Sequence, residues 1–270
     1  MMNKIWQAVL GMVFLLGGLT HPVYANHLSE NQEITLVLLR HGESTFNLEK
    51  RFSGWSNIDL TPKGVLQAQK AGEQMKKAGL KFDEVHTSVL QRAIKTAWAS
   101  MAVMGDVHTP QTGYWRLNER HYGDLEGKTH AEMIAKEGEK KVKTWRRSLD
   151  VAPPPLSDGD VRSPAREAQY AHIDPRILPK GESLQDTVTR IAPYWNDHLR
   201  PALYQGKNIL VVSHSSALKA LTYWIENDIQ PKDLPTLELP NATPVVYRLK
   251  IKGNQIQIVN KAILGKADSE

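Results

Sequence analysis

Two unbroken strand-like runs constrain the fold of this chain more than any other feature. The run over residues 36–39 is followed at once by Arg40 and His41, and the run over residues 208–213 is followed by His214. Short apolar runs of this kind are typical of strands that are buried on both faces of a parallel sheet. Because the carboxyl ends of parallel strands meet at one edge of the sheet, the two runs predict an α/β fold that brings two imidazoles together there.

The other segments predict the rest of an α/β domain. Thr61 and Pro62 predict a helix start, since Thr is a common N-cap and Pro suits the first helical position. The pattern predicts one three-layer sandwich, a mostly parallel central sheet with helices on both faces. We expect helices over 62–78, from 88 onward, 129–147, 182–203 and 215–227, and further strands over 82–87, 111–115, 244–251 and 255–259. The domain would span 34–262, with a Pro-, Ser- and Asp-rich surface excursion over 151–170 and a tail over 263–270.

The N-terminus resembles a secretory signal. Lys4 precedes an apolar run over 5–19, and Val23-Tyr24-Ala25 ends in small or branched residues suited to cleavage after Ala25. The apolar run is shorter than the roughly 20 residues that a membrane-spanning helix needs. We therefore expect a signal peptide over 1–25 and a spacer over 26–33. The protein would be periplasmic or secreted without stable membrane insertion, and cytoplasmic only if the segment is not used.

Composition narrows the class of partner. The formal charge is +5, and the chain contains no block of basic residues and no aromatic and basic platform on which bases could stack. Nucleic acid is therefore not an expected partner, whereas small anionic molecules suit the surplus charge. The chain has no cysteine, which excludes disulfides, thiolate metal sites and thiol nucleophiles.

Several polar residues suit phosphoryl chemistry, although each has an ordinary alternative. His41 beside Arg40 could act as a nucleophile toward a phosphoryl group whose oxygens the guanidinium neutralises, or the pair could lie in a basic surface turn. Arg92, near a helix N-terminus, could bind an anion or be a solvated arginine. The polar segment 116–123 lacks periodicity, which indicates a loop selected for its side chains.

In order along the chain, these motifs resemble the histidine phosphatase superfamily and, within it, the cofactor-dependent phosphoglycerate mutases. The matching motifs are Arg40-His41-Gly42-Glu43-Ser44 with Asn47, Phe52-Ser53-Gly54-Trp55, Leu60-Thr61-Pro62-Lys63-Gly64, Thr87-Ser88 with Arg92-Ala93 and Thr96, Arg116-Leu117-Asn118-Glu119-Arg120-His121-Tyr122-Gly123, Trp145-Arg146-Arg147-Ser148, Pro153-Pro154-Pro155, Glu182-Ser183-Leu184 and Leu239-Pro240. The Arg-His-Gly motif is shared by many phosphatases, whereas the segment 116–123 and the paired arginines are more specific to the mutases.

The resemblance implies a mechanism and a set of site residues. His41 would carry the phosphoryl group as a phosphohistidine, and Glu119 would be the general acid and base. Glu119 could instead be a loop glutamate paired with Arg120, and the paired arginines could simply end a basic helix. Arg40, Arg92 and His214 would complete the catalytic set, and substrate-binding residues would be Asn47, Ser53, Gly54, Arg120, His121, Tyr122, His130, Arg146, Arg147, Ser215 and Ser216. The implied primer is 2,3-bisphosphoglycerate, with no metal, and the resemblance leaves a homodimer open.

Three departures from the mutases concern the substrate pocket. His214 is followed by Ser215 and Ser216, where the mutases have Gly-Asn, so both a flexible backbone position and an amide are missing. His130 stands at the position of a carboxylate-binding lysine, and its charge would depend on pH. Phe46 replaces a tryptophan.

The resemblance predicts an enzyme that interconverts 3-phosphoglycerate and 2-phosphoglycerate through His41. An exported phosphomonoesterase is the alternative, because water in place of the acceptor hydroxyl gives hydrolysis with the same catalytic groups. A non-catalytic binder of phosphate esters is a further alternative, against which the retained His41, Glu119 and His214 argue.

Overall fold

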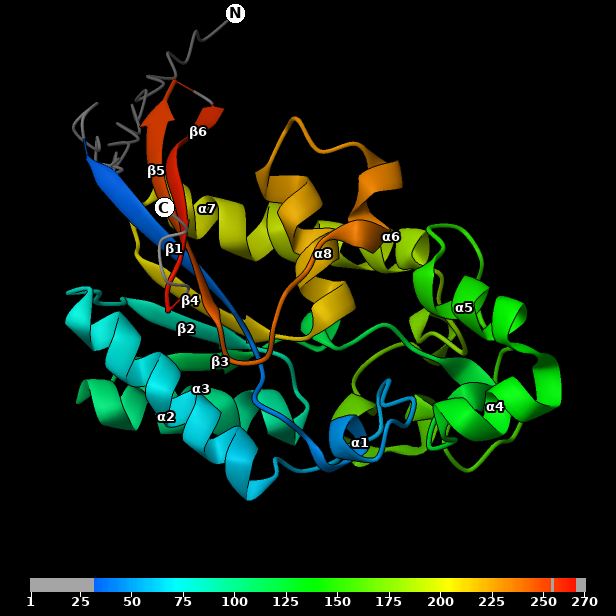
Figure 1. The fold of residues 1–270 in the computed structure, drawn as a ribbon. Coiled ribbons are helices and arrows are strands. Elements are labelled where there is room, and N and C mark those ends of the chain that lie inside the picture. The colour runs from blue at the N-terminus through cyan, green and yellow to red at the C-terminus, as the bar shows by residue number, and fades with distance from the viewer. Residues whose placement is uncertain (1–31, 254, 266–270) are drawn as a thin grey trace, which may run out of the picture.

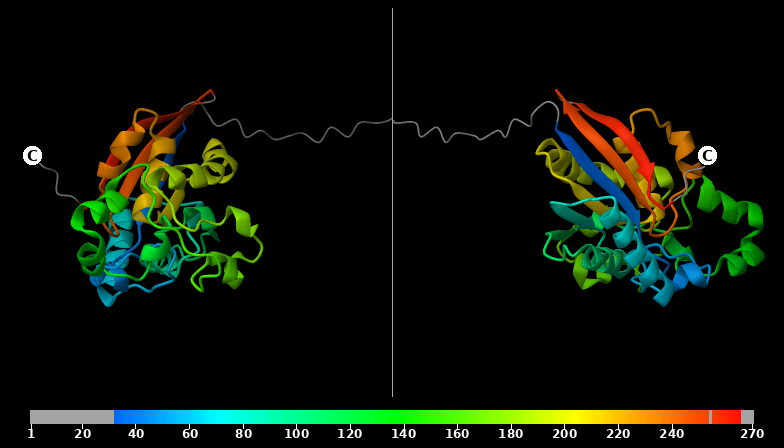
Figure 2. Two further views of the ribbon diagram at one scale, coloured as in Figure 1. Left: turned by 90° about the vertical axis from the view of Figure 1, so that its right-hand side faces the viewer. Right: turned by 60° about the vertical axis from the view of Figure 1, so that its left-hand side comes forward.

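A six-stranded mixed sheet forms the centre of the computed structural model, which describes residues 32–253 and 255–265 (Figure 1). The strands are ordered β3-β2-β4-β1-β5-β6, parallel from β3 to β1 and antiparallel from β1 to β6. Their bounds are Glu33–Arg40 (β1), Glu84–Thr87 (β2), Gln111–Gly113 (β3), Ile209–Ser213 (β4), Pro244–Lys252 (β5) and Gln255–Ile263 (β6). The expected mostly parallel sheet is therefore confirmed, with the C-terminal hairpin at one edge (Figure 2).

Helices cover both faces of the sheet, which makes the three layers that the sequence predicts (Figure 1). Val37 and Leu39 of β1 face the core under α2 and α3, whereas Leu36 and Leu38 face the core under α6 to α8. The alternation follows the two-residue period of a strand, and burial on both faces explains why the run is uniformly apolar. The helices are Thr45–Leu48 (α1), Pro62–Lys77 (α2), Gln91–Met104 (α3), His130–Glu137 (α4), Glu139–Arg147 (α5), Leu184–Tyr194 (α6), Arg200–Tyr204 (α7) and Ser215–Ile225 (α8).

Local sequence signals explain where the elements begin and end. The Thr61 side chain accepts a hydrogen bond from the Gly64 amide, and Pro62 opens α2 as expected. The helix predicted over 129–147 is instead two helices, because Gly138 adopts a φ of 83° and a ψ of 149°, a conformation that glycine tolerates and a helix does not. A π-helical turn over Trp195–Leu199 joins α6 to α7. The last strand runs to Ile263 and so reaches the first residue of the expected tail.

A separate small core lies beyond the carboxyl end of the sheet. Phe52, Leu125, Met133, Val142 and Trp145 are buried together, and they join the loop after α1 to α4 and α5. The excursion over 151–170 carries two short 3₁₀ helices and several buried side chains, so it packs onto this end of the domain. The loop after α1 and helices α4 and α5 contribute Phe52, His130, Arg146 and Arg147 to the cavity described below.

Two expectations concern membranes and the N-terminus. The segment 1–25, which resembles a signal peptide, lies outside the described residues. Within 32–253 and 255–265, no helix combines the length and apolar character needed to cross a bilayer.

Candidate active site

The ends of β1 and β4 bring the two predicted histidines together. Arg40 pairs with Ser213 in the parallel register, and the His41 amide donates to the Ser213 carbonyl at 2.9 Å. The ring centroids of His41 and His214 are consequently 5.0 Å apart, and both side chains are buried. The sheet thus forms the two-imidazole edge that the apolar runs predict.

Hydrogen bonding sets the tautomer of His41. Its Nδ1 lies 2.6 Å from the Gly42 carbonyl, which can only accept, so Nδ1 carries the proton and Nε2 keeps its lone pair. Burial, reinforced by Arg92 and Arg40, lowers the pKa of His41 well below its usual value. The imidazole is therefore uncharged at neutral pH, as a nucleophile must be. Gly42 permits this geometry, because a Cβ there would lie 2.2 Å from the Gly64 carbonyl oxygen.

Hydrogen bonding also sets the tautomer of His214. Ser88 Oγ lies 2.7 Å from His214 Nε2 and accepts from the Leu90 amide at 3.2 Å, so the hydroxyl proton is free to be donated to Nε2. Burial, followed by nearby Arg92, lowers the pKa of His214 well below its usual value. Its proton then resides on Nδ1, a buried donor for which the described residues offer no acceptor. An oxyanion beside His41 would supply that acceptor.

Two arginines lie near the imidazoles, Arg92 fully buried and Arg40 partly buried. Arg92 is fully buried, which rules out the solvated alternative, and it donates to the Ser56 and Gly54 carbonyls at 2.8 Å. Burial lowers the pKa of Arg92 to about 10, so it remains a cation at neutral pH. Arg40 donates to the Leu239 carbonyl at 3.0 Å. Among the described residues, neither arginine has a carboxylate partner or an acceptor for its Nε, which makes the site suited to an anion.

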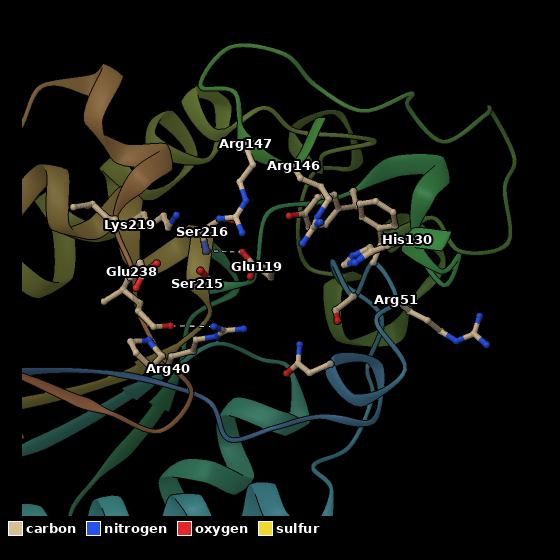
Figure 3. Close-up of a pocket in the computed structure, with 17 residues that line it drawn as sticks. Arg40, Arg51, Glu119, His130, Arg146, Arg147, Ser215, Ser216, Lys219 and Glu238 are labelled. Atoms are coloured by element: carbon tan, nitrogen blue, oxygen red, sulfur yellow. Dashed lines mark hydrogen bonds between the residues drawn. The ribbon is translucent and has the colours of Figure 1, made fainter. Parts of the chain in front are cut away.

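The Glu119 carboxylate is oriented by backbone groups. Its Oε1 accepts from the Arg120 amide at 2.8 Å and from the Ser216 amide at 3.0 Å, the latter at the start of α8 (Figure 3). The described residues show no ion pair between Glu119 and the Arg120 guanidinium, which was the alternative for this residue. Instead Arg120 donates to the Tyr122 hydroxyl at 2.8 Å. Glu119 therefore presents its carboxylate to the cavity, where it could exchange a proton with a substrate oxygen.

A buried ion pair holds the segment that carries Glu119. Arg190 of α6 pairs with Glu182 at 2.6 Å and also donates to the Asn118 and Glu119 carbonyls at 3.1 and 3.2 Å. Glu182 in turn accepts from the His121 amide at 2.8 Å. The sequence reasoning singled out Glu182 only as part of a motif and missed Arg190. This pair explains how a segment without regular structure holds its side chains in place.

A cavity of about 360 Å³ opens beside these groups (Figure 3). It is strongly cationic, with two carboxylates among its walls. The lining residues are Arg40, Asn47, Arg51, Phe52, Ser53, Glu119, Tyr122, His130, Arg146, Arg147, Ser215, Ser216, Lys219, Leu237, Glu238, Leu239 and Pro240. Ten of the predicted site residues are among these. Six others do not line the cavity: His41, Arg92 and His214 are buried beside it, and Gly54, Arg120 and His121 lie behind its walls.

The charged groups that line the cavity differ from those that the sequence predicts. Burial, with Arg146 second, lowers the pKa of His130 to about 4, so this side chain is uncharged at neutral pH and packs edge-on to Phe52 at 4.7 Å. Arg51 and Lys219 also line the cavity, and the sequence reasoning assigned no role to either. Lys219 could have been found, because it stands one helical turn after Ser215 and so shares its face of the helix.

Behind the cavity, His121 and Glu126 hold the backbone near Trp55 and over residues 121–123. His121 Nδ1 accepts from the Gly123 amide at 2.9 Å, and Glu126 accepts from the Trp55 and Tyr122 amides at 3.0 Å. Burial lowers the pKa of His121 to about 3 and raises that of Glu126 to about 7. Their 3.2 Å contact is therefore a contact of neutral groups at mildly acid pH and not an ion pair. Glu126 is a second residue that sequence reasoning missed.

Within the described residues, no group of three His, Asp or Glu side chains is arranged to hold a metal ion.

The fold and the site define a class of phosphoryl-transfer proteins. The family model "Histidine phosphatase superfamily (branch 1)" matches residues 36–168 and 161–262, and the chain belongs to this superfamily. Within it, the chain belongs to the family of 2,3-bisphosphoglycerate-dependent phosphoglycerate mutases, as three relatives with that name demonstrate.

The relatives come from three bacteria. The mutase 1 of Lactobacillus johnsonii is 44% identical over 84% of this chain and 96% of the relative. The mutase 2 of Latilactobacillus sakei is 46% identical over 79% of this chain and 93% of the relative. The mutase of Nitratidesulfovibrio vulgaris is 46% identical over 80% of this chain and 86% of the relative.

Solved structures show the same fold at lower identity. A mycobacterial hydrolase superposes with a TM-score of 0.64 at 22% identity, covering 84% of this chain and 97% of that chain. A mycobacterial glucosyl-3-phosphoglycerate phosphatase superposes with a TM-score of 0.63 at 22% identity, covering 84% and 98%. At this identity, the likeness establishes the fold alone.

The expectation of an exported protein is wrong. It is overturned by the relatives, which are named as phosphoglycerate mutases. The segment 1–25, on which the expectation rested, lies outside the described residues.

Proposed function

We propose that this chain is a 2,3-bisphosphoglycerate-dependent phosphoglycerate mutase that interconverts 3-phosphoglycerate and 2-phosphoglycerate through a phosphohistidine at His41. The observation that carries the proposal is the pairing of two uncharged, buried imidazoles with arginines that lack carboxylate partners, beside a cationic cavity that Glu119 lines. Relatives 44–46% identical over most of both chains support the choice of reaction.

The geometry of His41 supports its role as the phosphoryl acceptor. Nε2 attacks phosphorus, so an N–P bond forms while the P–O bond to the leaving oxygen breaks. The Gly42 carbonyl accepts the hydrogen bond from Nδ1–H and thereby stabilises the positive charge that develops on the ring. His214 Nδ1, Arg40 and Arg92 supply buried donors for the phosphoryl oxygens. When bound, 2,3-bisphosphoglycerate supplies the phosphoryl group that primes His41, and the orphaned donors and cationic walls fit such a polyanion.

Glu119 moves the proton in both directions. In one direction its carboxyl protonates the oxygen that leaves phosphorus, and in the other its carboxylate takes the proton from the attacking hydroxyl. The two backbone donors to Oε1 leave Oε2 as the oxygen available for this exchange. The transferred group thus passes between His41 and either hydroxyl of the glycerate, which isomerises the substrate.

Asn47, Ser53, Tyr122, Arg146, Arg147, Ser215 and Ser216 line the cavity and would hold the rest of the substrate. Asn47 Oδ1 accepts from the Ser44 amide at 3.1 Å, which leaves its NH₂ as the group that can face an oxyanion. The proposed partners are thus small anionic phosphate esters, with no nucleic acid. A homodimer is part of the proposal, and sedimentation equilibrium of the purified chain tests it.

The reaction is tested by ³¹P NMR of 3-phosphoglycerate mixed with purified protein, with and without 2,3-bisphosphoglycerate. We expect primer-dependent formation of 2-phosphoglycerate and an acid-labile, alkali-stable label that a His41→Ala variant loses. Release of inorganic phosphate without formation of 2-phosphoglycerate would refute the mutase assignment and indicate a phosphomonoesterase. Unchanged turnover in the His41→Ala variant would refute the phosphohistidine mechanism.

A further inference from the structure

We propose that Lys219 binds the anionic group of the substrate that is not transferred, and that it thereby selects phosphate esters that carry a second negative charge. The inference rests on the proposed function and deepens it, since it concerns specificity at the same cavity. Neither the motifs nor the departures noted in the sequence assign this residue a role.

The position of Lys219 follows from the start of α8. That helix begins at Ser215, directly after His214, and Lys219 stands one turn further on the same face. Ser215, Ser216 and Lys219 all line the cavity, and the Lys219 side chain is only 7% exposed. In Figure 3, Lys219 and Ser216 lie on the side of the cavity opposite His130 and Arg51.

The charge of Lys219 is not balanced by the protein. Its ammonium group donates to the Pro235 carbonyl at 2.8 Å, and the described residues place no carboxylate within ion-pairing distance of it. Arg51, by contrast, is paired with Glu49. An ammonium group has three donors, so Lys219 retains two that can face the cavity. A buried cation without a counterion is costly, and a bound anion removes that cost.

The groups that face Lys219 are mainly cationic. Arg147, Arg120 and Arg40 lower its pKa and Glu119 raises it, but burial is the largest cause and brings the value to about 8. Glu238 also lines the cavity. Lys219 is thus mostly charged at neutral pH and loses its charge in mildly alkaline solution.

The uncharged state of His130 makes Lys219 necessary for this role. The resemblance to the mutases implies a lysine at position 130, whereas here the pKa of His130 is lowered to about 4 and the ring carries no charge at neutral pH. Lys219 and Arg147 supply positive charge from a different wall of the cavity. A carboxylate or second phosphate lying across the cavity would meet this wall.

Binding by a matched pair of ligands tests the inference. Isothermal titration of unprimed protein compares 3-phosphoglycerate with glycerol 3-phosphate, which has a CH₂OH group where the former has its carboxylate. We expect Lys219→Met to weaken binding of 3-phosphoglycerate by about ten- to a hundredfold, the loss typical of one hydrogen bond between charged groups, and to leave glycerol 3-phosphate within about twofold. Lys219→Arg should retain the preference for 3-phosphoglycerate. In the unmodified protein that preference should fall as pH rises through about 8, and in the arginine variant it should not.

Two further variants separate charge from folding. Lys219→Gln keeps a donor for the Pro235 carbonyl but has no charge, so it should lose the preference while retaining the thermal midpoint of the unmodified protein. Lys232→Met removes an exposed lysine from the neighbouring segment Pro231–Thr236 and should change neither property. Equal weakening of both ligands, or of neither, in a folded Lys219→Met or Lys219→Gln variant would overturn the inference. Because the readout is binding, a protein that fails to isomerise phosphoglycerate but keeps the Lys219-dependent preference would refute the mutase assignment alone.

Discussion

Replacing Glu126 by glutamine should remove one component of the pH dependence of stability. Burial raises the pKa of this carboxyl to about 7 from a reference value of 4.5. Glutamine has nearly the same shape, retains an oxygen that can accept from the Trp55 and Tyr122 amides, and does not ionise. The variant therefore isolates the free-energy cost of ionising a buried carboxyl behind the cavity.

The sign follows from proton binding. Between pH 4.5 and 7 the unfolded chain loses the Glu126 proton while the folded chain retains it, so the folded state is progressively less favoured as pH rises. The contribution is fully present below about pH 4.5 and is lost by the time pH passes 7. A shift of about 2.5 pKa units corresponds to about 3 kcal/mol at 1.36 kcal/mol per unit.

Urea unfolding at pH 5 and pH 8 measures this effect as a difference between the two proteins. Buried histidines change stability with pH as well, but they are common to both proteins and cancel in the comparison. We expect Glu126→Gln to gain about 2.5 kcal/mol relative to the unmodified protein between the two pH values, because part of the contribution is already lost at pH 5. A difference that does not change with pH would refute the assignment of a neutral, buried Glu126.

Three further predictions concern the surrounding scaffold and the chemistry. Arg190→Met should lower the free energy of unfolding by about 3–5 kcal/mol because it leaves Glu182 buried and unpaired, and urea titration should show partial recovery when Glu182 is also changed to leucine. Glu119→Gln should lower kcat by about 10²- to 10⁴-fold while His41 can still be labelled by a good leaving-group ester, and a smaller loss in stopped-flow kinetics would argue against general acid catalysis. Gly54→Ala should destabilise the fold by more than about 1 kcal/mol in thermal denaturation, because φ is +46° and the new Cβ would lie 1.8 Å from Glu126 Oε1.

The sequence was sufficient to predict where the two histidines lie because that place depends on strand ends. The two runs before His41 and His214 are apolar on both faces, which predicted two parallel strands in the interior of one sheet with their carboxyl ends at one edge, and the structure pairs them directly. The same reasoning predicted the layers and the N-cap at Thr61. The break at Gly138 was missed because helical periodicity continues across it, although a glycine at that point was a visible signal.

Other site features depend on contacts between segments far apart in the chain, which periodicity does not reveal. The Glu126 carboxyl group accepts a hydrogen bond from the Trp55 amide, and Arg190 donates one to the Glu119 carbonyl. The partners in each pair are about 70 residues apart in the sequence. The charge of His130 depends on its burial near Arg146, which only the folded structure provides. The predicted export failed for a different reason, because it rested on the resemblance of a terminal segment to a signal peptide.

The electrostatics of the site connect its stability to its function. Arg92 and Lys219 are buried and Arg40 is partly buried, all without carboxylate partners in the described chain, so the folded protein bears a desolvation cost that a bound polyanion would reduce. Neutral His41 avoids adding to this cost, since burial, reinforced by the cations that would hold the phosphoryl oxygens, keeps the imidazole unprotonated. The cations that would bind the phosphoryl group therefore also contribute to the neutral ground state of the imidazole. The nucleophile is available before the substrate arrives, and the ring becomes cationic only when it carries an anionic phosphoryl group.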